Sequence, residues 1–270
     1  KNLSLELASI TNITPDHLDY HETFHKYKLC KLKIIKFLKR NGTFILNVNN
    51  KLLSEIINDK IFKSINIIKI KNSKVNNYIN DNDYLKGFHN KINGSIAISI
   101  AKYLKITDEQ IKHAIKHFKG LPHRMEPLHI SDKVKIINDS KSTNGESTAA
   151  ALQSFENIFW IVGGQPKLGG IGASKNFLDR VVEAFLIGKS TNFFKKEISK
   201  FRQGLPLHNC LTLEKATQLA LKKSEKSNLK RYVILLSPSA ASFDQFENFE
   251  DRGNKFRAIV NQNLNQGLKK

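Results

Sequence analysis

The sequence is poor in the features that mark secreted and membrane proteins. Only two cysteines, Cys30 and Cys210, occur among its 270 residues, too few and too far apart for a disulfide framework or a zinc site. No apolar run approaches the roughly 18 residues that a membrane span requires. We therefore expect a protein of the reducing cytoplasm that has no membrane partner.

The beginning of the chain also lacks two common features. Lys1 stands where an initiator Met is usual, and no charged segment followed by an apolar stretch resembles a signal peptide. The chain is therefore expected to be a piece of a longer protein and not a secreted precursor.

Arginine is scarce although the chain is strongly basic. The net charge is +20, a value that normally raises the question of nucleic-acid binding. Only seven of the 44 basic side chains are arginine, the usual base-reading residue, and the lysines are scattered among many Asn and Ile residues. An excess of Lys, Asn and Ile is typical of proteins encoded by AT-rich genomes. In addition, no basic helix with interleaved aromatic residues occurs. We expect no nucleic-acid partner.

A phosphate-binding loop of the Walker A type is absent as well. The pattern Gly-x-x-x-x-Gly-Lys-Ser/Thr, whose backbone amides cradle phosphates, occurs nowhere in the chain. The pairs Gly163-Gly164 and Gly169-Gly170 do not replace it, because their spacing differs and the closing Lys-Ser/Thr pair is missing.

The residues that are present predict two α/β units separated at Gly120-Leu121-Pro122. Before this boundary, helices are predicted over 24–38 and 90–104 and from Thr107, and strands over 43–48 and 65–70. After it, strands over 134–137, 158–162 and 232–236 alternate with helices over 145–154, 175–184, 214–223 and 246–263. Such alternation is typical of a doubly wound, Rossmann-like parallel sheet with helices on both faces.

Three of the predicted strands run into polar loops, at 138–144, 163–167 and 237–243. Ligands of open α/β sheets bind beyond the carboxyl ends of the strands, so we expect the three loops to form one anion-holding site. Asp139 and Lys141 have the charges to hold a ribose and a phosphate. The alternative is structural: Thr143 caps the next helix and the lysine lies on the surface.

Two further motifs leave alternatives open. Asp16-His17-Leu18-Asp19 can bind a metal or a phosphate, but Asp at a helix start also serves as an N-cap, which its spacing favours. Arg124, just after the unit boundary, can grip a nucleotide phosphate in bidentate fashion or form an interdomain salt bridge with Glu126.

Six strings, taken in order, resemble the Mur ligases. They are 12–20 (NITPDHLDY), 87–93 (GFHNKIN), 120–126 (GLPHRME), 137–144 (INDSKSTN), 163–167 (GGQPK) and 236–254 (LSPSAASFDQFENFEDRGN). Their order and approximate spacing fit the family from about residue 8 to the end of the chain. The last string is close to diagnostic for the branch of the family that adds D-glutamate.

The resemblance implies a partial central ATP-binding domain over 1–120 and the C-terminal domain, for amino-acid binding and nucleotide closure, over 121–270. The family's uridine-nucleotide domain, phosphate loop and acidic magnesium ligand have no counterpart here. The implied activity is an ATP-dependent amide ligase that adds D-glutamate to UDP-N-acetylmuramoyl-L-alanine through an acyl phosphate. It would act as a cytoplasmic monomer with Mg²⁺, and the chain alone is expected to be inactive.

The resemblance also implies a role for individual residues. His17 matches a magnesium ligand, and Lys31 matches a carbamylated lysine, in which CO₂ turns a cation into an oxygen donor. Asn90 and Asn93 match contacts to adenine. Positions matching nucleotide contacts made on closure are Arg124, Asp139 and Lys141. Positions matching the D-glutamate pocket are Thr143, Lys167, Ser242, Phe243 and Phe249.

Two alternatives remain beside this function. The first is that the chain is part of another Mur ligase or of a folylpolyglutamate synthase relative, which an amino-acid swap in an activity assay distinguishes. The second is that the chain is a non-catalytic fragment that binds an amino acid or a nucleotide. Nucleotide binding by the isolated chain tests this alternative.

Overall fold

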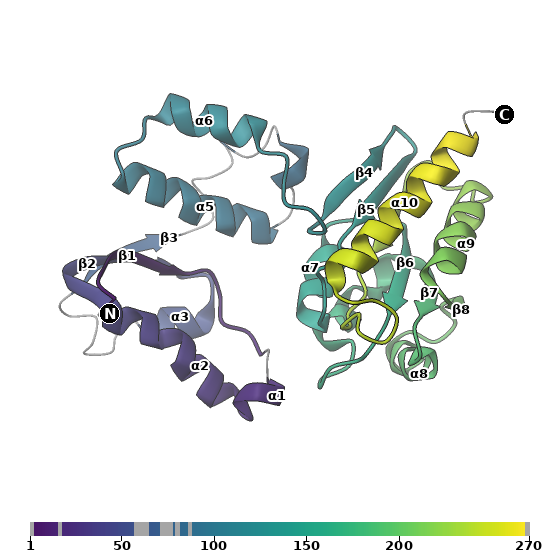
Figure 1. Ribbon diagram of the computed structural model, residues 1–270, viewed down its shortest axis with the longest axis horizontal. Helices are drawn as coiled ribbons and strands as arrows, with labels where there is room; N and C mark the ends of the chain where they lie inside the picture. Colours follow the sequence, from purple (N-terminus) through teal and green to yellow (C-terminus); the bar gives the residue numbers. More distant parts are fainter. Residues whose placement is uncertain are drawn as a thin grey trace. The chain divides into compact units, whose positions relative to one another are not determined.

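The computed structural model in Figure 1 describes residues 3–15, 18–56, 65–70, 78, 82–85 and 88–267. The chain divides into two compact units, Lys1–Phe118 and Lys119–Lys270. Each unit is built on a sheet whose strands are mostly parallel, so the predicted α/β class is confirmed. None of the helices in these described ranges is both long and apolar enough to cross a membrane.

The first unit contains a three-stranded parallel sheet in the order β1-β2-β3. Its strands are β1 (Leu5–Ile10), β2 (Leu38–Asn47) and β3 (Asn66–Ile70). Its helices are α1 (Leu18–His21), α2 (Phe24–Leu32), α3 (Lys51–Ile56), α5 (Phe88–Tyr103) and α6 (Asp108–His117), with 3₁₀ turns η1 (Lys33–Phe37) and η4 (Asp83–Leu85).

Alternate residues of β2 supply the cores on its two faces, as the period of a strand requires. Phe44 packs in one cluster with Tyr27 of α2 and Leu53 of α3. Ile45, its neighbour, packs on the other side with Ile96 of α5. The strand is therefore apolar on both faces, because helices cover both.

The predicted boundary between the helix at 24–38 and the following strand was wrong. The α-helix ends at Leu32, a 3₁₀ turn follows, and β2 begins at Leu38. Asn41 has a φ of 65° and lies inside β2, where the pairing with β1 shifts register. The Asn41-Gly42 pair therefore marks an irregularity within β2 and not the end of a helix. A left-handed residue is found at both kinds of position. The predicted cap at Thr107 is confirmed, with Gln110 completing a capping box.

The second unit contains a six-stranded sheet in the order β4-β5-β9-β6-β7-β8, in which only the β4–β5 pair is antiparallel. The strands are β4 (Glu126–Ile130), β5 (Val134–Asn138), β6 (Ile158–Gly163), β7 (Val181–Ile187), β8 (Leu207–Leu211) and β9 (Tyr232–Leu236). The connecting elements are α7 (Gly145–Gln153), η5 (Gly172–Arg180), α8 (Thr191–Phe201), α9 (Leu213–Glu225) and α10 (Phe249–Gly267).

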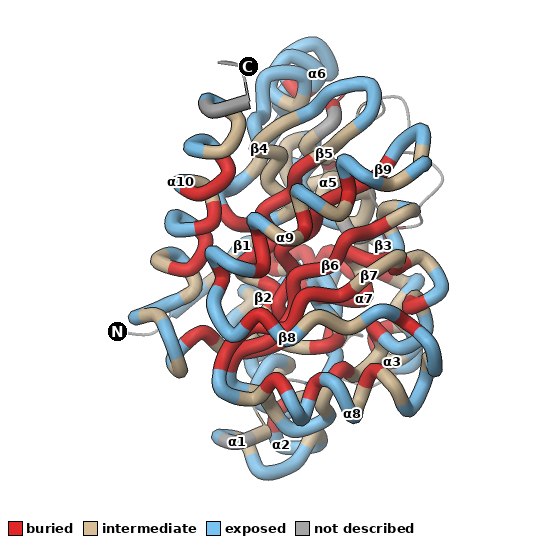
Figure 2. Tube along the Cα trace, turned by 90° about the vertical axis from the view of Figure 1, so that its right-hand side faces the viewer, coloured by how far each residue is buried: buried red, intermediate tan, exposed pale blue. Residues whose placement is uncertain are grey.

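Helices cover both faces of this sheet. One cluster joins strand residues such as Trp160 to Leu152 of α7 and Phe194 of α8. The other joins Phe159 to Ala216 of α9 and Phe256 of α10. All six residues of β6 are buried, and Figure 2 shows the burial concentrated in the central strands. The predicted doubly wound arrangement is thus present.

The helix predicted over 175–184 was wrong. Those residues form the 3₁₀ segment η5 and the start of strand β7. A short apolar run such as Val181–Ile187 suits a buried helix and a buried strand equally well. The segment forms a strand because it lies between β6 and β8, where its backbone N–H and C=O groups pair on both sides. The edge strand β8 and helix α8 were not predicted.

Strand order brings three polar loops together. β9 is the last strand in the sequence but lies between β5 and β6. The carboxyl ends of these three parallel strands are therefore adjacent, which places the loops that follow them at one edge of the sheet.

Candidate active site at the carboxyl edge of the second sheet

Backbone hydrogen bonds join the loops after β5, β6 and β9 into one surface. Gly163 N–H donates to Pro238 O at 3.0 Å, and Gln165 and Ala241 exchange two bonds at 2.9 and 3.0 Å. Ser239 N–H donates to Ser142 O at 3.0 Å. Residues nearly 100 positions apart are therefore held in contact by the strand order.

Two consecutive glycines allow the end of β6 to approach its neighbours closely, Gly163 at the end of β7 and Gly164 at the β9 loop. Gly163 and Gly164 both have a φ of 131°, which L side chains rarely adopt. A Cβ on Gly163 would lie 2.1 Å from Ile187 O, and one on Gly164 would lie 2.4 Å from Ala241 O. These glycines therefore serve close packing of the loops, where a Walker-type loop would use them to cradle phosphate.

Asp139 lies at the centre of this surface and is buried. Its carboxylate accepts hydrogen bonds from Met125 N–H at 3.1 Å and from the Ser237 hydroxyl at 2.9 Å. Burial raises the pKa of Asp139 to about 7, against the opposing effects of these bonds and of the Arg124 charge. The group therefore titrates near neutral pH, far above an ordinary aspartic acid.

Stability is expected to fall as the pH rises, in a window set by Asp139. The unfolded carboxyl loses its proton near pH 4 and the folded one near pH 7, so between these values the folded state binds the extra proton. The raised pKa removes up to about 4 kcal/mol of stability across the window. An Asp139→Asn variant lacks this contribution, while its amide can still accept from Met125 N–H and donate to Ser237. Urea unfolding of both proteins from pH 4 to 8 measures the difference; equal pH slopes would contradict the assignment.

Lys141 and Phe249 lie together at this edge. The Lys141 ammonium is 3.7 Å from the centre of the Phe249 ring, a cation–π contact that joins the β5 loop to the start of α10. The backbone N–H of Lys141 donates to His123 O at 3.0 Å. Both residues are partly exposed, so a ligand can reach them.

The helix after the β5 loop is capped by Asn144 and not by Thr143. Asn144 Oδ1 accepts from Ser147 N–H at 2.9 Å, and its φ and ψ are extended. The structural role that the sequence allowed for Thr143 is therefore wrong. Thr143 is partly exposed in the same loop as Asp139 and Lys141.

The positions matched to the D-glutamate pocket do not share one environment. Lys167 is partly buried in the loop after β6, and its carbonyl accepts from Gly170 N–H at 3.2 Å. Ser242 is buried, and its carbonyl accepts from the amides of Gln245 and Phe246. The Phe243 side chain, by contrast, is 71% exposed.

Arg252 of α10 is a site residue that sequence analysis missed. It is fully buried. Its Nε donates to Ser140 Oγ at 3.0 Å, and its Nη2 donates to Ser140 O at 2.9 Å and Ala240 O at 3.1 Å. Burial lowers the pKa of Arg252 to about 10, so it stays charged at neutral pH. One guanidinium thereby holds the β5 loop to the β9 loop. Its place in the 236–254 string was the available signal.

The remaining predicted positions lie in the first unit or outside the described residues. Lys31 is exposed on α2, with its ammonium 5.0 Å from the centre of the Tyr27 ring. Asn90 is partly buried on α5, and Asn93 is exposed one turn later. His17 lies outside the described residues.

Within the ranges that the structure describes, no group of three or more His, Cys, Asp or Glu side chains could hold a metal ion. Mg²⁺ prefers oxygen ligands, and an unmodified Lys31 offers only an amine.

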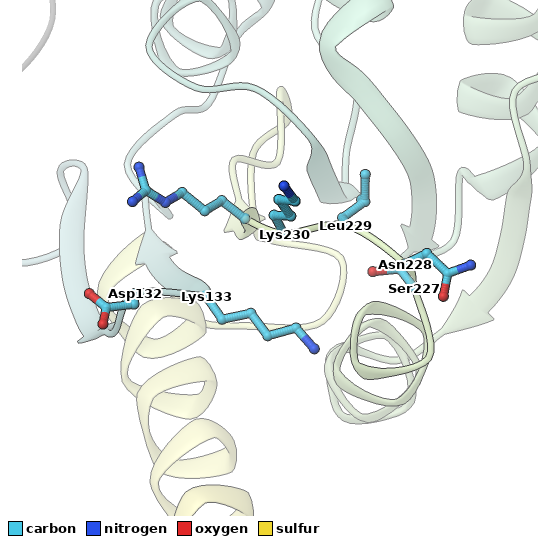
Figure 3. Close-up of a pocket in the computed structure, with 7 residues that line it drawn as sticks. Asp132, Lys133, Ser227, Asn228, Leu229 and Lys230 are labelled. Carbon is cyan, nitrogen blue, oxygen red and sulfur yellow. The ribbon is translucent and has the colours of Figure 1, made fainter.

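A cavity of about 700 Å³ lies at the opposite edge of the second sheet. It is lined by Lys133, just before β5, and by Lys230 and Arg231, just before β9. Figure 3 shows Lys133 and Lys230 on two separate segments that border the cavity. The cavity lies at the amino ends of the strands, away from the loops where α/β sheets bind ligands, so we do not take it as the active site.

Comparison with known proteins finds a family model that matches the first unit and relatives that match most of the chain. Residues 1–113 match the model of the Mur ligase middle domain. The UDP-N-acetylmuramoylalanine–D-glutamate ligase of Agrobacterium fabrum is 34% identical over 276 residues, covering 93% of this chain and 57% of that protein. The enzyme of the same name from Rickettsia felis is 32% identical over 277 residues, covering 96% and 61%. The chain thus spans about 60% of the length of these relatives.

Solved structures support the fold. MurF from Acinetobacter baumannii superposes with a TM-score of 0.68 at 16% identity, covering 94% of this chain and 60% of that one. MurF from Thermotoga maritima, solved in complex with ADP, gives 0.65 at 14% identity, covering 96% and 63%. Together, the middle-domain match and the identity to curated ligases show that the chain is similar to the Mur ligases over most of its length, and the solved structures show that it shares their fold.

Proposed function

We propose that the chain is the C-terminal part of an ATP-dependent ligase that adds D-glutamate to UDP-N-acetylmuramoyl-L-alanine in peptidoglycan precursor synthesis. Residues 1–120 are assigned to the central ATP-binding domain and 121–270 to the C-terminal domain. The observation that carries this proposal is the single surface that three loops form at the carboxyl edge of the second sheet. Relatives that bear the name of this ligase support the choice of amino acid.

The proposed reaction divides the site into two regions. ATP transfers its γ-phosphoryl group to the L-alanyl carboxylate, which releases ADP and forms an acyl phosphate. The D-glutamate amine then attacks the acyl carbon, and inorganic phosphate leaves. Arg124, Asp139 and Lys141 are assigned to the nucleotide, because phosphoryl transfer depends on positioning and on neutralising charge.

The second region holds the amino acid. D-glutamate brings two carboxylates, and Lys167 is the cation of the β6 loop that is assigned to one of them. Thr143, Ser242, Phe243 and Phe249 complete the proposed pocket. The proposal further includes Asn90 and Asn93 at the adenine, a monomeric cytoplasmic enzyme, and Mg²⁺ with His17 and a carbamylated Lys31 as protein ligands. Only carbamylation gives Lys31 the oxygen that this ion prefers.

Phosphate release by the full-length protein tests the function. With ATP and UDP-N-acetylmuramoyl-L-alanine, release is expected to depend on D-glutamate and to stay at background with L-glutamate or a diamino acid. The 270-residue chain alone is expected to release none, because it lacks a loop that holds the β- and γ-phosphates. Release with a different amino acid, or with a folate and glutamate, would assign the chain to another branch of the family.

A further inference from the structure

The loop between the unit boundary and β4 has an unusual backbone on both sides of Arg124. His123 has a φ of 61° and Met125 a φ of 48°. For residues other than glycine this left-handed region is energetically unfavourable, and such conformations persist only where the surroundings enforce them. The flanking residues therefore require specific support.

Two carboxylates supply that support, one on each side. Glu126 Oε2 accepts from the backbone N–H of His123 at 3.0 Å, and Asp139 Oδ1 accepts from the backbone N–H of Met125 at 3.1 Å. The Arg124 amide itself donates to Leu121 O at 3.2 Å and closes the turn. The backbone N–H groups of Arg124 and of both its neighbours are thus hydrogen-bonded, while the Arg124 side chain is exposed.

Glu126 is in turn held by α10. Arg257 Nη2 donates to both carboxylate oxygens of Glu126, at 2.7 and 2.9 Å, and the Asn138 amide donates to Oε2 at 3.0 Å. Glu126 therefore pairs with Arg257, and the alternative of a salt bridge between Glu126 and Arg124 is wrong. The bond is charge-assisted and only partly exposed, so it is stronger than a hydrogen bond between neutral groups.

Helix α10 also fits closely against the His123 ring. His123 is buried, and a Cβ on Gly253 would lie 2.1 Å from its Nδ1. Burial lowers the pKa of His123, which favours the neutral ring whose Nδ1 accepts from the Asn138 amide at 3.1 Å. The loop therefore rests on α10 through both the imidazole and Glu126.

We propose that Glu126, together with Arg257, is a positioning residue that holds the 119–125 loop in its strained form and so presents the Arg124 guanidinium to the nucleotide phosphates. This inference rests on the proposed function for the identity of the ligand. The order of the loop itself is a property of the second unit and does not depend on that function.

Trypsin cleavage after Arg124 tests the order of the loop in the 270-residue chain. A Glu126→Gln variant loses the ion pair with Arg257, so cleavage after Arg124 is expected to be at least about tenfold faster, since cleavage follows the open population. The control is Arg180→Gln, which breaks the Arg180–Glu156 pair at 3.0 Å, whose Glu156 side chain is 66% exposed against 18% for Glu126. Mass spectrometry identifies the cut. Equal rates in the two variants would overturn the proposal.

Kinetics of the full-length protein test the effect on the nucleotide. Glu126→Gln and Arg257→Gln are each expected to raise the KM for ATP about 5- to 20-fold and to leave the KM for D-glutamate within about twofold, an effect of roughly one decade. The double variant should be no worse than Glu126→Gln alone, because both act on one loop. An unchanged KM for ATP, or an equal rise for D-glutamate, refutes the positioning role.

The two proposals fail in different ways. If the wild-type protein shows no phosphate release with D-glutamate, the proposed function is wrong. Calorimetry then compares the affinity of the wild-type protein and of the same variants for ADP, which needs no turnover. A loss of affinity confined to Glu126→Gln and Arg257→Gln supports the positioning role. Equal affinities in all variants refute it.

Discussion

Replacing Lys167 by alanine in the full-length protein is expected to raise the KM for D-glutamate by roughly 10–1000-fold, at 1.4 kcal/mol per decade. Lys167 is partly buried in the β6 loop, beside the loops that carry Thr143 and Ser242. Removing a cation from a partly dry site leaves the ligand carboxylate unpaired, which costs a few kcal/mol. Steady-state kinetics with D-glutamate as the varied substrate measure the effect.

The KM for ATP separates this assignment from a general disturbance of the site. It is expected to change much less, because Lys167 is assigned to the amino acid and not to the phosphates. Lys196→Ala, which removes an exposed lysine of α8, serves as the control and should leave both constants unchanged. If the KM for ATP rises while that for D-glutamate stays constant, the pocket has been placed wrongly.

Replacing Lys31 by alanine in the full-length protein is expected to lower activity by on the order of 10–100-fold or more, a loss typical for groups that support a metal site. The expectation rests on the proposed carbamate, which supplies oxygens where the unmodified side chain supplies a cation. A small added carboxylate such as formate should therefore restore part of the activity, whereas an added amine should not.

A second measurement keeps the carbamate separate from the activity. Carbon-13-labelled CO₂ should give a carbamate NMR signal in the wild-type protein that is lost in Lys31→Ala. Lys28→Ala, on the same helix α2, is the control and should retain both the signal and the activity. Full activity in Lys31→Ala contradicts the assignment.

The location of the candidate site could be predicted from the sequence more completely than several of the helices and strands that carry it. The polar loops after β5, β6 and β9 were expected at one edge of a sheet, because parallel strands place their carboxyl ends together. The helix expected over 175–184 was wrong, because an apolar run has no period that separates a buried strand from a buried helix. The strand at Leu207–Leu211 is short, lies at the edge and carries no such pattern.

Arg252 lies within the 236–254 string, but the contacts that hold the site together could not be found from local patterns. Arg252 and Ser140 are 112 positions apart, and Arg257 and Glu126 are 131 apart. Nothing in the composition of α10 distinguishes Arg252, which is buried, from Arg257, which is partly exposed. Their roles follow from the position of α10 against the loops of the sheet, which only long-range packing determines.

The sequence by itself indicated the resemblance to the Mur ligases, the α/β class and the positions of the polar loops, because these depend on short strings and on local apolar periods. The tertiary structure decided the order of the strands, and with it the insertion of β9 between β5 and β6. It also decided the environment of Asp139, whose pKa of about 7 follows from burial by residues distant in the sequence. A charged side chain takes its chemistry from the dielectric and the donors around it, and those are fixed only when the chain has folded.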